Sequence, residues 1–362
     1  MNVWRYIGVL FFAAAVTCFV STQIPAGAGG KDAKQDKDKG KDDKDKGKDD
    51  KGKKDDGKAK KDDEKKKGDE KPAGKAEFKA FDSKDPFYQE VRTETTQIMT
   101  VMGQQVTQKQ DQTFYIEWTP KGKDKDGNYE VAQKVIGVKM NIDIGGNKIA
   151  YDSQLPPDKQ PKNPMTDFFT ALMSQPLTFT ISPDLDIKKI DGRTDFIKKL
   201  SDTNPAIKTL LDTIMSENAL KKMADPTWFA VPPADTSKPW TKSSELKLGP
   251  IGTYDTTFTF TLKSSDKGKD TIEVQADLKY TPPTDKEKGG LPFTIKSAKL
   301  ESKEGKGTAV FDRQLGRIES STLTMKLKGN LTIEVGNMAT DIELDQTQTS
   351  TTKTTSTNPL KK

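Results

Sequence analysis

Apolar and polar residues alternate along much of the chain after Phe78, and this alternation predicts antiparallel strands. Residues 272–280 are the clearest run, because Ile272, Val274 and Leu278 share one face while polar and charged residues occupy the other. A period of two is the pattern of a strand with one buried and one solvated face. The same pattern recurs in residues 114–118, 129–144, 254–262, 323–327 and 331–335.

The run at 129–144 changes phase near its centre. Tyr129 and Val131 begin the alternation, but after Val135 and Ile136 it continues on the other parity. One extra residue in the strand would return the apolar side chains to a single face. We therefore expect a β-bulge near Gly137.

Helical spacing replaces the alternation in the middle of the chain. Residues 165–173 carry an apolar stripe behind Asn163, a favoured N-cap residue, and Pro164, which suits the first helical position. Similar signals predict helices at 195–200 and, behind Asn204 and Pro205, at 207–215.

Two segments outside this helical region resemble each other. Residues 149–155 read Ile-Ala-Tyr-Asp-Ser-Gln-Leu and residues 309–315 read Ala-Val-Phe-Asp-Arg-Gln-Leu, each after a long strand pattern. This internal similarity favours a duplicated β-meander. We predict an α+β fold in which two antiparallel β-meanders form one curved sheet or half-barrel, with two to three central helices packed on its concave face.

The amino-terminal residues indicate export. Arg5 precedes an apolar run at 7–20, and Ala26 and Ala28 place small residues at the −3 and −1 positions of a cut after Ala28. The run is shorter than the ~20 apolar residues that span a bilayer. We expect a cleaved signal peptide at 1–28, although retention as an anchor is the alternative.

Residues 29–77 form a Lys/Asp/Gly tether that cannot bury enough apolar surface to fold. It holds 19 Lys against 16 Asp and Glu, so it is nearly balanced, unlike a nucleic-acid-binding arm. The formal net charge of the chain is only +6, and we predict no nucleic-acid partner. The tether is either a spacer or a solubilising segment.

The expected organisation follows from these segments. A β-rich globular domain should cover residues 78–346, with meanders at about 85–160 and 242–346 and helices between them at 163–223. Residues 347–362, rich in Thr, Gln, Ser and Lys, are expected to form a polar tail that begins as a frayed strand end.

The residues that are missing restrict the chemistry. The chain has no His, and its one cysteine, Cys18, lies in the predicted signal peptide. His-containing triads, His-rich zinc sites and thiol redox centres are therefore excluded. Carboxylate chemistry remains open through Asp152 and Asp312, which the internal similarity could bring together. We expect no enzyme activity, no cofactor and no metal.

Two motifs invite other interpretations. Asp124, Asp126 and Asn128 match the first positions of an EF-hand loop, but Tyr129 stands where that loop requires Gly. A hairpin turn explains the motif better. Residues 305–308 (Gly-Lys-Gly-Thr) lack the upstream glycine of a phosphate loop and also predict a hairpin turn.

The central helices offer the candidate ligand site. Their apolar residues could simply form the core, or they could line a cavity for a hydrophobic ligand. The candidate lining residues are Phe168, Phe169, Met173, Ile214 and Met215. A proline- and aromatic-rich connector at 228–240 follows the helices and is either a packed crossover or a recognition loop.

The order of these parts resembles a known family. A meander ending in Tyr151-Asp152, helices, a crossover ending at Trp240 and a second meander ending in Phe311-Asp312 resemble exported proteins of unknown function from planctomycete-like bacteria, over about residues 85–347. The architecture also resembles bacterial lipoprotein carriers, in which a curved sheet wraps helices around a hydrophobic cavity. That resemblance implies an architecture, because a fold does not fix a function.

These observations favour a non-enzymatic binding protein of the periplasm or cell surface, possessing no transmembrane segment once the signal is removed. Its expected partner is an unknown hydrophobic ligand or an envelope component. The alternatives are a structural or interaction protein of the cell envelope and, more remotely, a carboxylate-based hydrolase.

Overall fold

The structure is a computed structural model that describes residues 76–161, 164–224, 231–287 and 289–361. The predicted signal peptide, Cys18, nearly all of the tether, Asn163 and Trp228 lie outside these residues. None of the described helices combines the length and apolar composition needed to cross a membrane.

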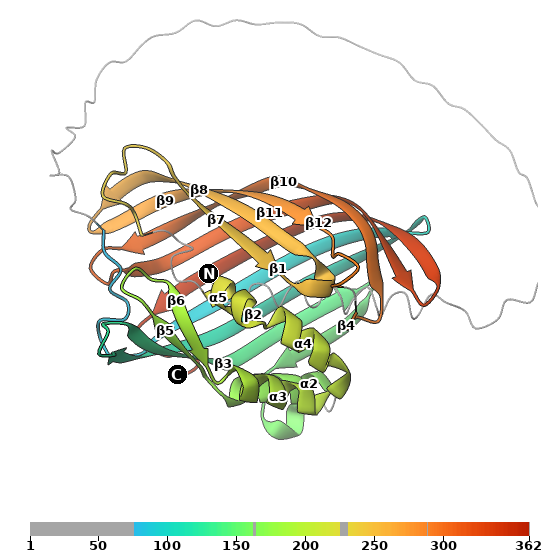
Figure 1. The fold of residues 1–362 in the computed structure, drawn as a ribbon, viewed down its shortest axis with the longest axis horizontal. Coiled ribbons are helices and arrows are strands. Elements are labelled where there is room, and N and C mark those ends of the chain that lie inside the picture. Colours follow the sequence, from blue (N-terminus) through green and yellow to red (C-terminus); the bar gives the residue numbers. More distant parts are fainter. Residues whose placement is uncertain (1–75, 162–163, 225–230, 288, 362) are drawn as a thin grey trace, which may run out of the picture.

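One large antiparallel sheet dominates the fold (Figure 1). Its strand order is β6-β5-β3-β2-β1-β12-β11-β10-β9-β8-β7, and β4 pairs with β3 beside this path. The strands are β1 (Phe87–Val101), β2 (Gln104–Lys123), β3 (Tyr129–Ile144), β4 (Asn147–Asp152), β5 (Leu177–Ile181), β6 (Ile187–Asp191), β7 (Trp240–Lys247), β8 (Thr253–Asp266), β9 (Lys269–Thr281), β10 (Thr294–Asp312), β11 (Arg317–Val335) and β12 (Met338–Thr355).

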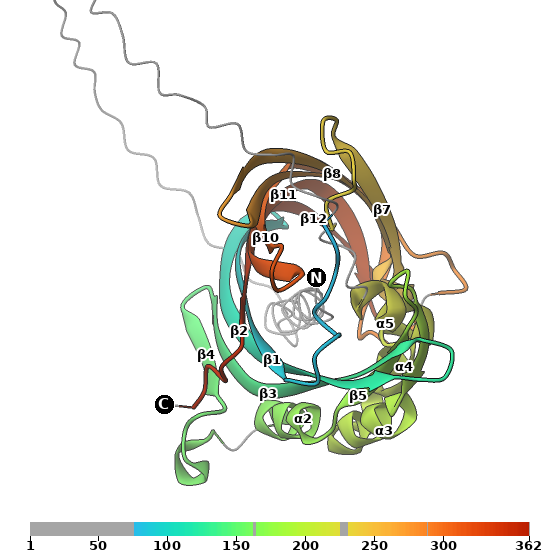
Figure 2. The ribbon, with the colours of Figure 1, turned by 90° about the vertical axis from the view of Figure 1, so that its left-hand side faces the viewer.

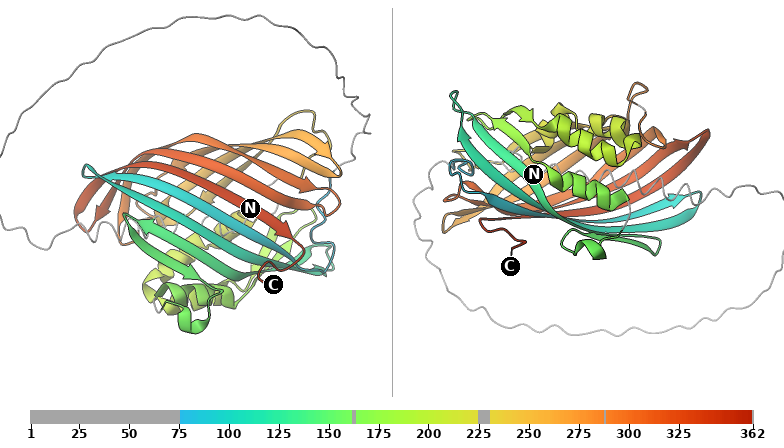
Figure 3. Two further views of the ribbon diagram at one scale, coloured as in Figure 1. Left: turned by 180° about the vertical axis from the view of Figure 1, so that it is seen from behind. Right: turned by 90° about the horizontal axis from the view of Figure 1, so that it is seen from below.

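Two meanders build this sheet, and they join through their outermost strands. β1 to β4 form the first meander and β7 to β12 the second. β1 pairs with β12 over nearly its whole length, for example Thr93 with Ser350 and Val101 with Ile342. Figure 3, from behind, shows the two meanders as one continuous curved sheet. The predicted α+β fold with a curved, half-barrel-like sheet is confirmed.

The sheet has an inner face, which packs against the helices, and an outer face. Val91, Phe114 and Val138 occupy the inner face of neighbouring strands and are almost fully buried. The predicted bulge in β3 is present, because the register with β2 shifts between Val135 and Gly137 and leaves Ile136 as the extra residue.

The helices lie between the two edges of the sheet. Figure 2 shows α4 and α5 in the interval between β5 and β7, and α2 contacts β3. The helix predicted behind Asn163 does begin at Pro164. The sequence analysis identified no individual helix at α5 and no individual strand at β1, β5, β6 or β7. The helices are α2 (Pro164–Ser174), α3 (Arg193–Thr203), α4 (Lys208–Ile214) and α5 (Glu217–Ala224), with 3-10 turns at Pro157–Lys159, Pro205–Ile207 and Gly249–Ile251.

Two predictions of secondary structure from the sequence are wrong. Residues 347–355, assigned to a polar tail, continue β12 and pair on both sides with β1 and β11. Residues 305–308, expected to form a hairpin turn, lie inside β10. A Cβ atom on Gly307 would clash with the carbonyl oxygen of Thr322 in β11, so glycine here permits a close approach of two strands.

The first described residues enter the space enclosed by the sheet. Ala76 is buried in a cluster with Phe258 and Phe260, whereas Phe81 packs against Phe87 and Trp118 in another cluster. Figure 2 shows this segment, in blue, crossing the enclosed space. The end of the predicted tether is thus part of the core.

A buried ion pair fixes the turns at this end of the sheet. Asp270 in β9 is fully buried, and its Oδ2 lies 2.7 Å from Nε of Arg313 in the β10–β11 turn. Ser265 Oγ donates a hydrogen bond of 2.6 Å to Asp270 Oδ1. The pair links the β8–β9 hairpin to the β10–β11 hairpin.

Removing the charge of Asp270 should destabilise the protein. Asp270→Asn leaves the Arg313 guanidinium without its carboxylate, and we expect the free energy of unfolding in urea to fall by about 3 kcal/mol. Lys328→Gln, which removes an exposed pair with Asp345, is the control and should cost less than about 1 kcal/mol. Equal losses in the two variants would contradict this role for Asp270.

Candidate functional site

The five residues proposed to line a cavity lie in one packed cluster. Phe169, Ile214 and Met215 are buried, and Phe168 and Met173 pack against the same cluster from partly buried positions. The Phe169 ring stacks on Tyr151 of β4 with 4.7 Å between centroids. These contacts are those of core packing between helices and sheet.

Asp152 and Asp312 do not form a common site. Five strands separate β4, which ends at Asp152, from β10, which ends at Asp312. Asp152 Oδ1 accepts a hydrogen bond of 2.9 Å from the Gln154 N–H, and Asp312 Oδ1 accepts one of the same length from the Gln314 N–H. Each carboxylate organises the turn that follows its own strand.

The Asp124 loop is a hairpin turn between β2 and β3. Asp124 Oδ1 accepts hydrogen bonds of 2.9 Å from the N–H groups of Asp126 and Asn128. A hydrogen bond from the Asn128 side chain, together with these two backbone bonds, lowers the pKa of Asp124. Over the residues that the structure describes, no group of three or more His, Cys, Asp and Glu side chains is arranged to hold a metal ion.

An uncharged polar patch occupies the centre of the inner face. It consists of three side chains from each of three adjacent strands, which lie opposite one another in three cross-strand rows. We call this set the inner polar patch. Its rows, each in the order β2, β1, β12, are Gln108, Gln97 and Gln346; Gln110, Thr95 and Gln348; and Gln112, Thr93 and Ser350.

Six of the nine residues of the inner polar patch are buried and the other three are partly buried, and the hydrogen bonding of the patch is incomplete. Gln110 Nε2 donates to Gln112 Oε1 at 2.8 Å, and Gln97 Nε2 donates to Gln346 Oε1 at 3.4 Å. Gln108 Oε1 and Gln112 Nε2 have no hydrogen-bond partner within the described chain, although these two residues are only 2% and 1% exposed. Buried amide atoms in proteins are normally paired.

Apolar side chains border the patch on both sides. Met140 and Ile142 of β3 lie opposite Gln112 and Gln110, and Leu323 of β11 lies opposite Ser350. The arrangement offers hydrogen bonds to an uncharged polar group and apolar contacts to the groups attached to it.

The sequence analysis missed this patch. Gln, Thr and Ser at alternate positions look like the solvated face of a strand, because the apolar residues that mark a buried face are absent. The signal was the contrast with the opposite parity, where Glu94, Lys109 and Asp111 are charged. Two alternating polar faces, only one of them charged, indicate that the uncharged face is the enclosed one.

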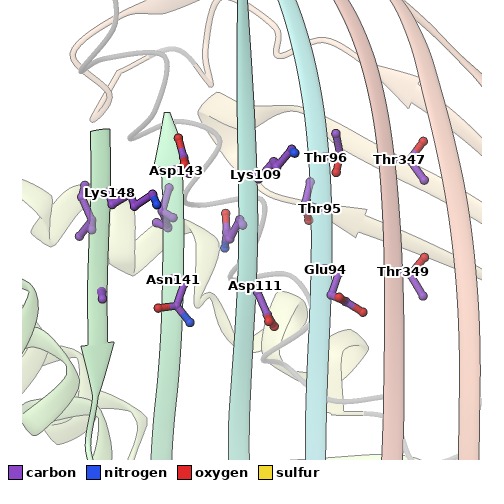
Figure 4. A pocket seen from close by; sticks show the side chains of 14 residues that line it. Glu94, Thr95, Thr96, Lys109, Asp111, Asn141, Asp143, Lys148, Thr347 and Thr349 are labelled. Atoms are coloured by element: carbon purple, nitrogen blue, oxygen red, sulfur yellow. The ribbon is translucent and has the colours of Figure 1, made fainter. Parts of the chain in front are cut away.

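The outer face of the same strands carries a shallow groove of about 720 Å³. Figure 4 shows its side chains in two rows across β4, β3, β2, β1 and β12. The first row contains Lys148, Asp143, Lys109, Thr96 and Thr347, and the second contains Asn141, Asp111, Glu94 and Thr349.

Charges in this outer groove are only partly paired. Arg92, next to the groove, lies 2.8 Å from Asp111 and 2.9 Å from Glu94, and the hydrogen bond to Asp111 raises the pKa of Arg92. Lys109 and Lys148 make no ion pair with another described residue. The outer groove therefore presents two ammonium groups without an ion pair, on the two sides of the Asp143 carboxylate and beside amide and hydroxyl groups.

The geometry defines an α+β protein built on one open, curved antiparallel sheet with a buried polar patch at its centre. By sequence, the chain belongs to a family of unknown function, DUF6263, whose model matches residues 126–316, more than half of the chain. The match confirms the expected membership of a family of unknown function over a shorter segment than 85–347. A planctomycete-like origin and a likeness to lipoprotein carriers stay predictions.

Other comparisons add no argument about function. A search of curated proteins found no match. Among solved structures, DynF from the dynemicin biosynthesis pathway of Micromonospora chersina is 10% identical, with 73% of this chain and 80% of DynF covered and a TM-score of 0.15. OccK5 (OpdH) of Pseudomonas aeruginosa is 9% identical, with 78% and 100% covered and a TM-score of 0.19. OpdL of the same organism is 8% identical, with 75% and 99% covered and a TM-score of 0.20. Scores this low do not establish a shared fold.

The structural role of Asp312 can be tested directly. Asp312→Ala removes the acceptor for the Gln314 and Leu315 N–H groups and should lower the free energy of unfolding by about 1 kcal/mol. Asp312→Asn keeps an acceptor oxygen and should lose less than half of that. An equal loss in the two variants, which both remove the charge, would show that the charge matters more than the acceptor oxygen.

Proposed function

We propose that this protein is a non-enzymatic, exported binding protein that holds a neutral amphipathic ligand against the inner face of its sheet. The observation that carries the proposal is the pair of buried, unpartnered amide atoms, Gln108 Oε1 and Gln112 Nε2. A buried polar atom without a partner costs about 1–3 kcal/mol. A ligand that supplies a donor and an acceptor would remove that cost.

The apolar border of the inner polar patch supports the amphipathic character of this ligand. Met140 and Met325 flank the patch on opposite sides, and methionine side chains adapt readily to hydrocarbon of varied shape. The candidate residues Phe168 and Met173 are the partly buried members of the helical cluster.

The absence of charge in the patch restricts the ligand further. None of its nine residues is ionisable, so a charged head group would lose its hydration without gaining an ion pair. We infer that the ligand's polar group is an alcohol, an amide or a similar uncharged function. The tether would then hold the module at a distance from its point of attachment.

Replacing Gln108 should separate binding from stability. Gln108→Met removes an unpartnered buried acceptor, so the free energy of unfolding of the ligand-free protein should rise by about 1 kcal/mol. Native mass spectrometry of the full chain purified from its own host should show a bound small molecule in the wild type and its loss in Gln108→Met.

Gln97→Met provides the matched comparison. This change breaks the bond to Gln346, so it should lower stability rather than raise it. The proposal fails if the wild type carries no adduct, or if Gln108→Met destabilises the protein as much as Gln97→Met does.

A second candidate function rests on the outer groove. The ammonium groups of Lys109 and Lys148, which lie on the two sides of Asp143, favour a polar component of the cell envelope bound to the outer face. In this case the protein would be an interaction protein held by its sheet. A carboxylate-based hydrolase finds no support in the separate positions of Asp152 and Asp312.

Binding to isolated cell envelopes of the host tests this second candidate. Lys109→Gln combined with Lys148→Gln should reduce the sedimented fraction at least threefold, because both lysine charges of the outer groove are lost. Lys279→Gln, an exposed lysine on β9, is the control and should leave it unchanged. Equal effects of the two sets of substitutions would mean that general charge, and not the groove, causes retention.

A further inference from the structure

Two hairpin tips project from the same end of the sheet. The β1–β2 turn contains Met102 and Gly103, and β12 begins at Met338 after the β11–β12 turn. Because Val101 pairs with Ile342, these two turns lie at one end of neighbouring strands. Figure 1 shows both hairpins reaching beyond the body of the sheet, at the right. We call Met102 and Met338 the tip methionines.

Met102 has a backbone conformation and a side-chain exposure that are both unusual for methionine. Its backbone has φ +51°, in the left-handed region that Gly, Asn and Asp occupy most readily. Its side chain is 79% exposed, the largest value among the exposed large apolar residues, and that of Met338 is 49% exposed. A strained backbone and a solvated apolar side chain together point to a contact that is absent from the isolated chain.

The tips also lack charge. Residues 100–108 and 335–340 contain no Asp, Glu, Lys or Arg, although 31% of the chain is charged. A partner recognised through these tips must therefore be neutral at the point of contact. An acidic membrane or a charged protein surface would leave its own charges without counterparts here.

An apolar cluster continues from the tips along the inner face. Met99, Leu331, Ile342 and Leu344 are buried members of this cluster, and Met99 is two residues from Gln97 of the inner polar patch. The opposite end of the sheet receives the tether, since the Lys79 N–H donates to the Gly316 carbonyl oxygen at 2.9 Å. The tips therefore face away from the tether.

We propose that the tip methionines form a docking surface for a neutral lipid surface. Two separate protruding apolar side chains with uncharged surroundings suit shallow insertion among lipid acyl chains, as apolar anchors of peripheral proteins do. This surface does not depend on the ligand of the inner polar patch. If that ligand is lipid-like, docking places the apolar cluster of the inner face next to its source.

Flotation with phosphatidylcholine vesicles tests the docking surface, using protein purified from its host. The wild type should bind, and binding should be insensitive to salt because no charges take part. Met102→Asn and Met338→Gln should each weaken binding about tenfold. Leu315→Gln is the matched control, because Leu315 is 48% exposed at the opposite end, and it should bind like the wild type.

A measurement of thermal stability distinguishes a docking role of Met102 from a structural role. Asparagine tolerates φ +51° better than methionine, so Met102→Asn should raise the Tm while it weakens vesicle binding. The proposal is overturned if binding requires phosphatidylglycerol, if Leu315→Gln weakens it as much as the tip variants, or if Met102→Asn lowers the Tm. Concentration-dependent dimers that only the tip variants abolish would also overturn it, in favour of a second copy as the partner.

Discussion

Antiparallel pairing between β1 and β12 joins the first and last strands of the described chain, and the interior of the molecule depends on it. Thr93 and Ser350 face each other across this pairing although 257 residues separate them in sequence. Closing so long a loop is entropically unfavourable until many contacts form together. Without this pairing, the two meanders would be separate sheets with open edges, and the inner polar patch, which spans β2, β1 and β12, would not exist.

Sequence analysis succeeded where an element has a local signal. Strands such as β9 have an apolar face, so the period-two pattern of Ile272 and Val274 was sufficient to identify them. The bulge at Ile136 and the helix start at Pro164 were likewise visible, because a change of phase and a proline have local causes. These features depend on a few neighbouring residues.

The failures concern strands whose partners are distant in sequence. Residues 347–355 are almost entirely Thr, Gln, Ser and Lys, and they become a strand because β1 and β11 supply partners on both sides. Gly305 and Gly307 resembled a turn, but in β10 they allow neighbouring backbones to approach closely. The patch formed by Gln108 and its neighbours could not be recognised before the register of three strands was known. The β-propensity of a segment depends on its own residues, whereas its pairing depends on strands that can be distant in sequence.

The distribution of charge also follows from the difference between the enclosed inner face and the solvated outer face of the sheet. Charged side chains such as Arg92, Lys109 and Asp111 remain on the outer face, where water and neighbouring counterions stabilise them. On the inner face the central strands carry amides and hydroxyl groups, whose burial without a partner costs a few kcal/mol at most. An unpaired buried charge would cost several times more.

A protein that must be stable both with and without a ligand can tolerate an unsatisfied glutamine but not an unsatisfied carboxylate. An uncharged polar interior beside apolar clusters is therefore the composition expected of the proposed ligand site, and it differs from the buried ion pair of Asp270 and Arg313, in which each charge needs the other.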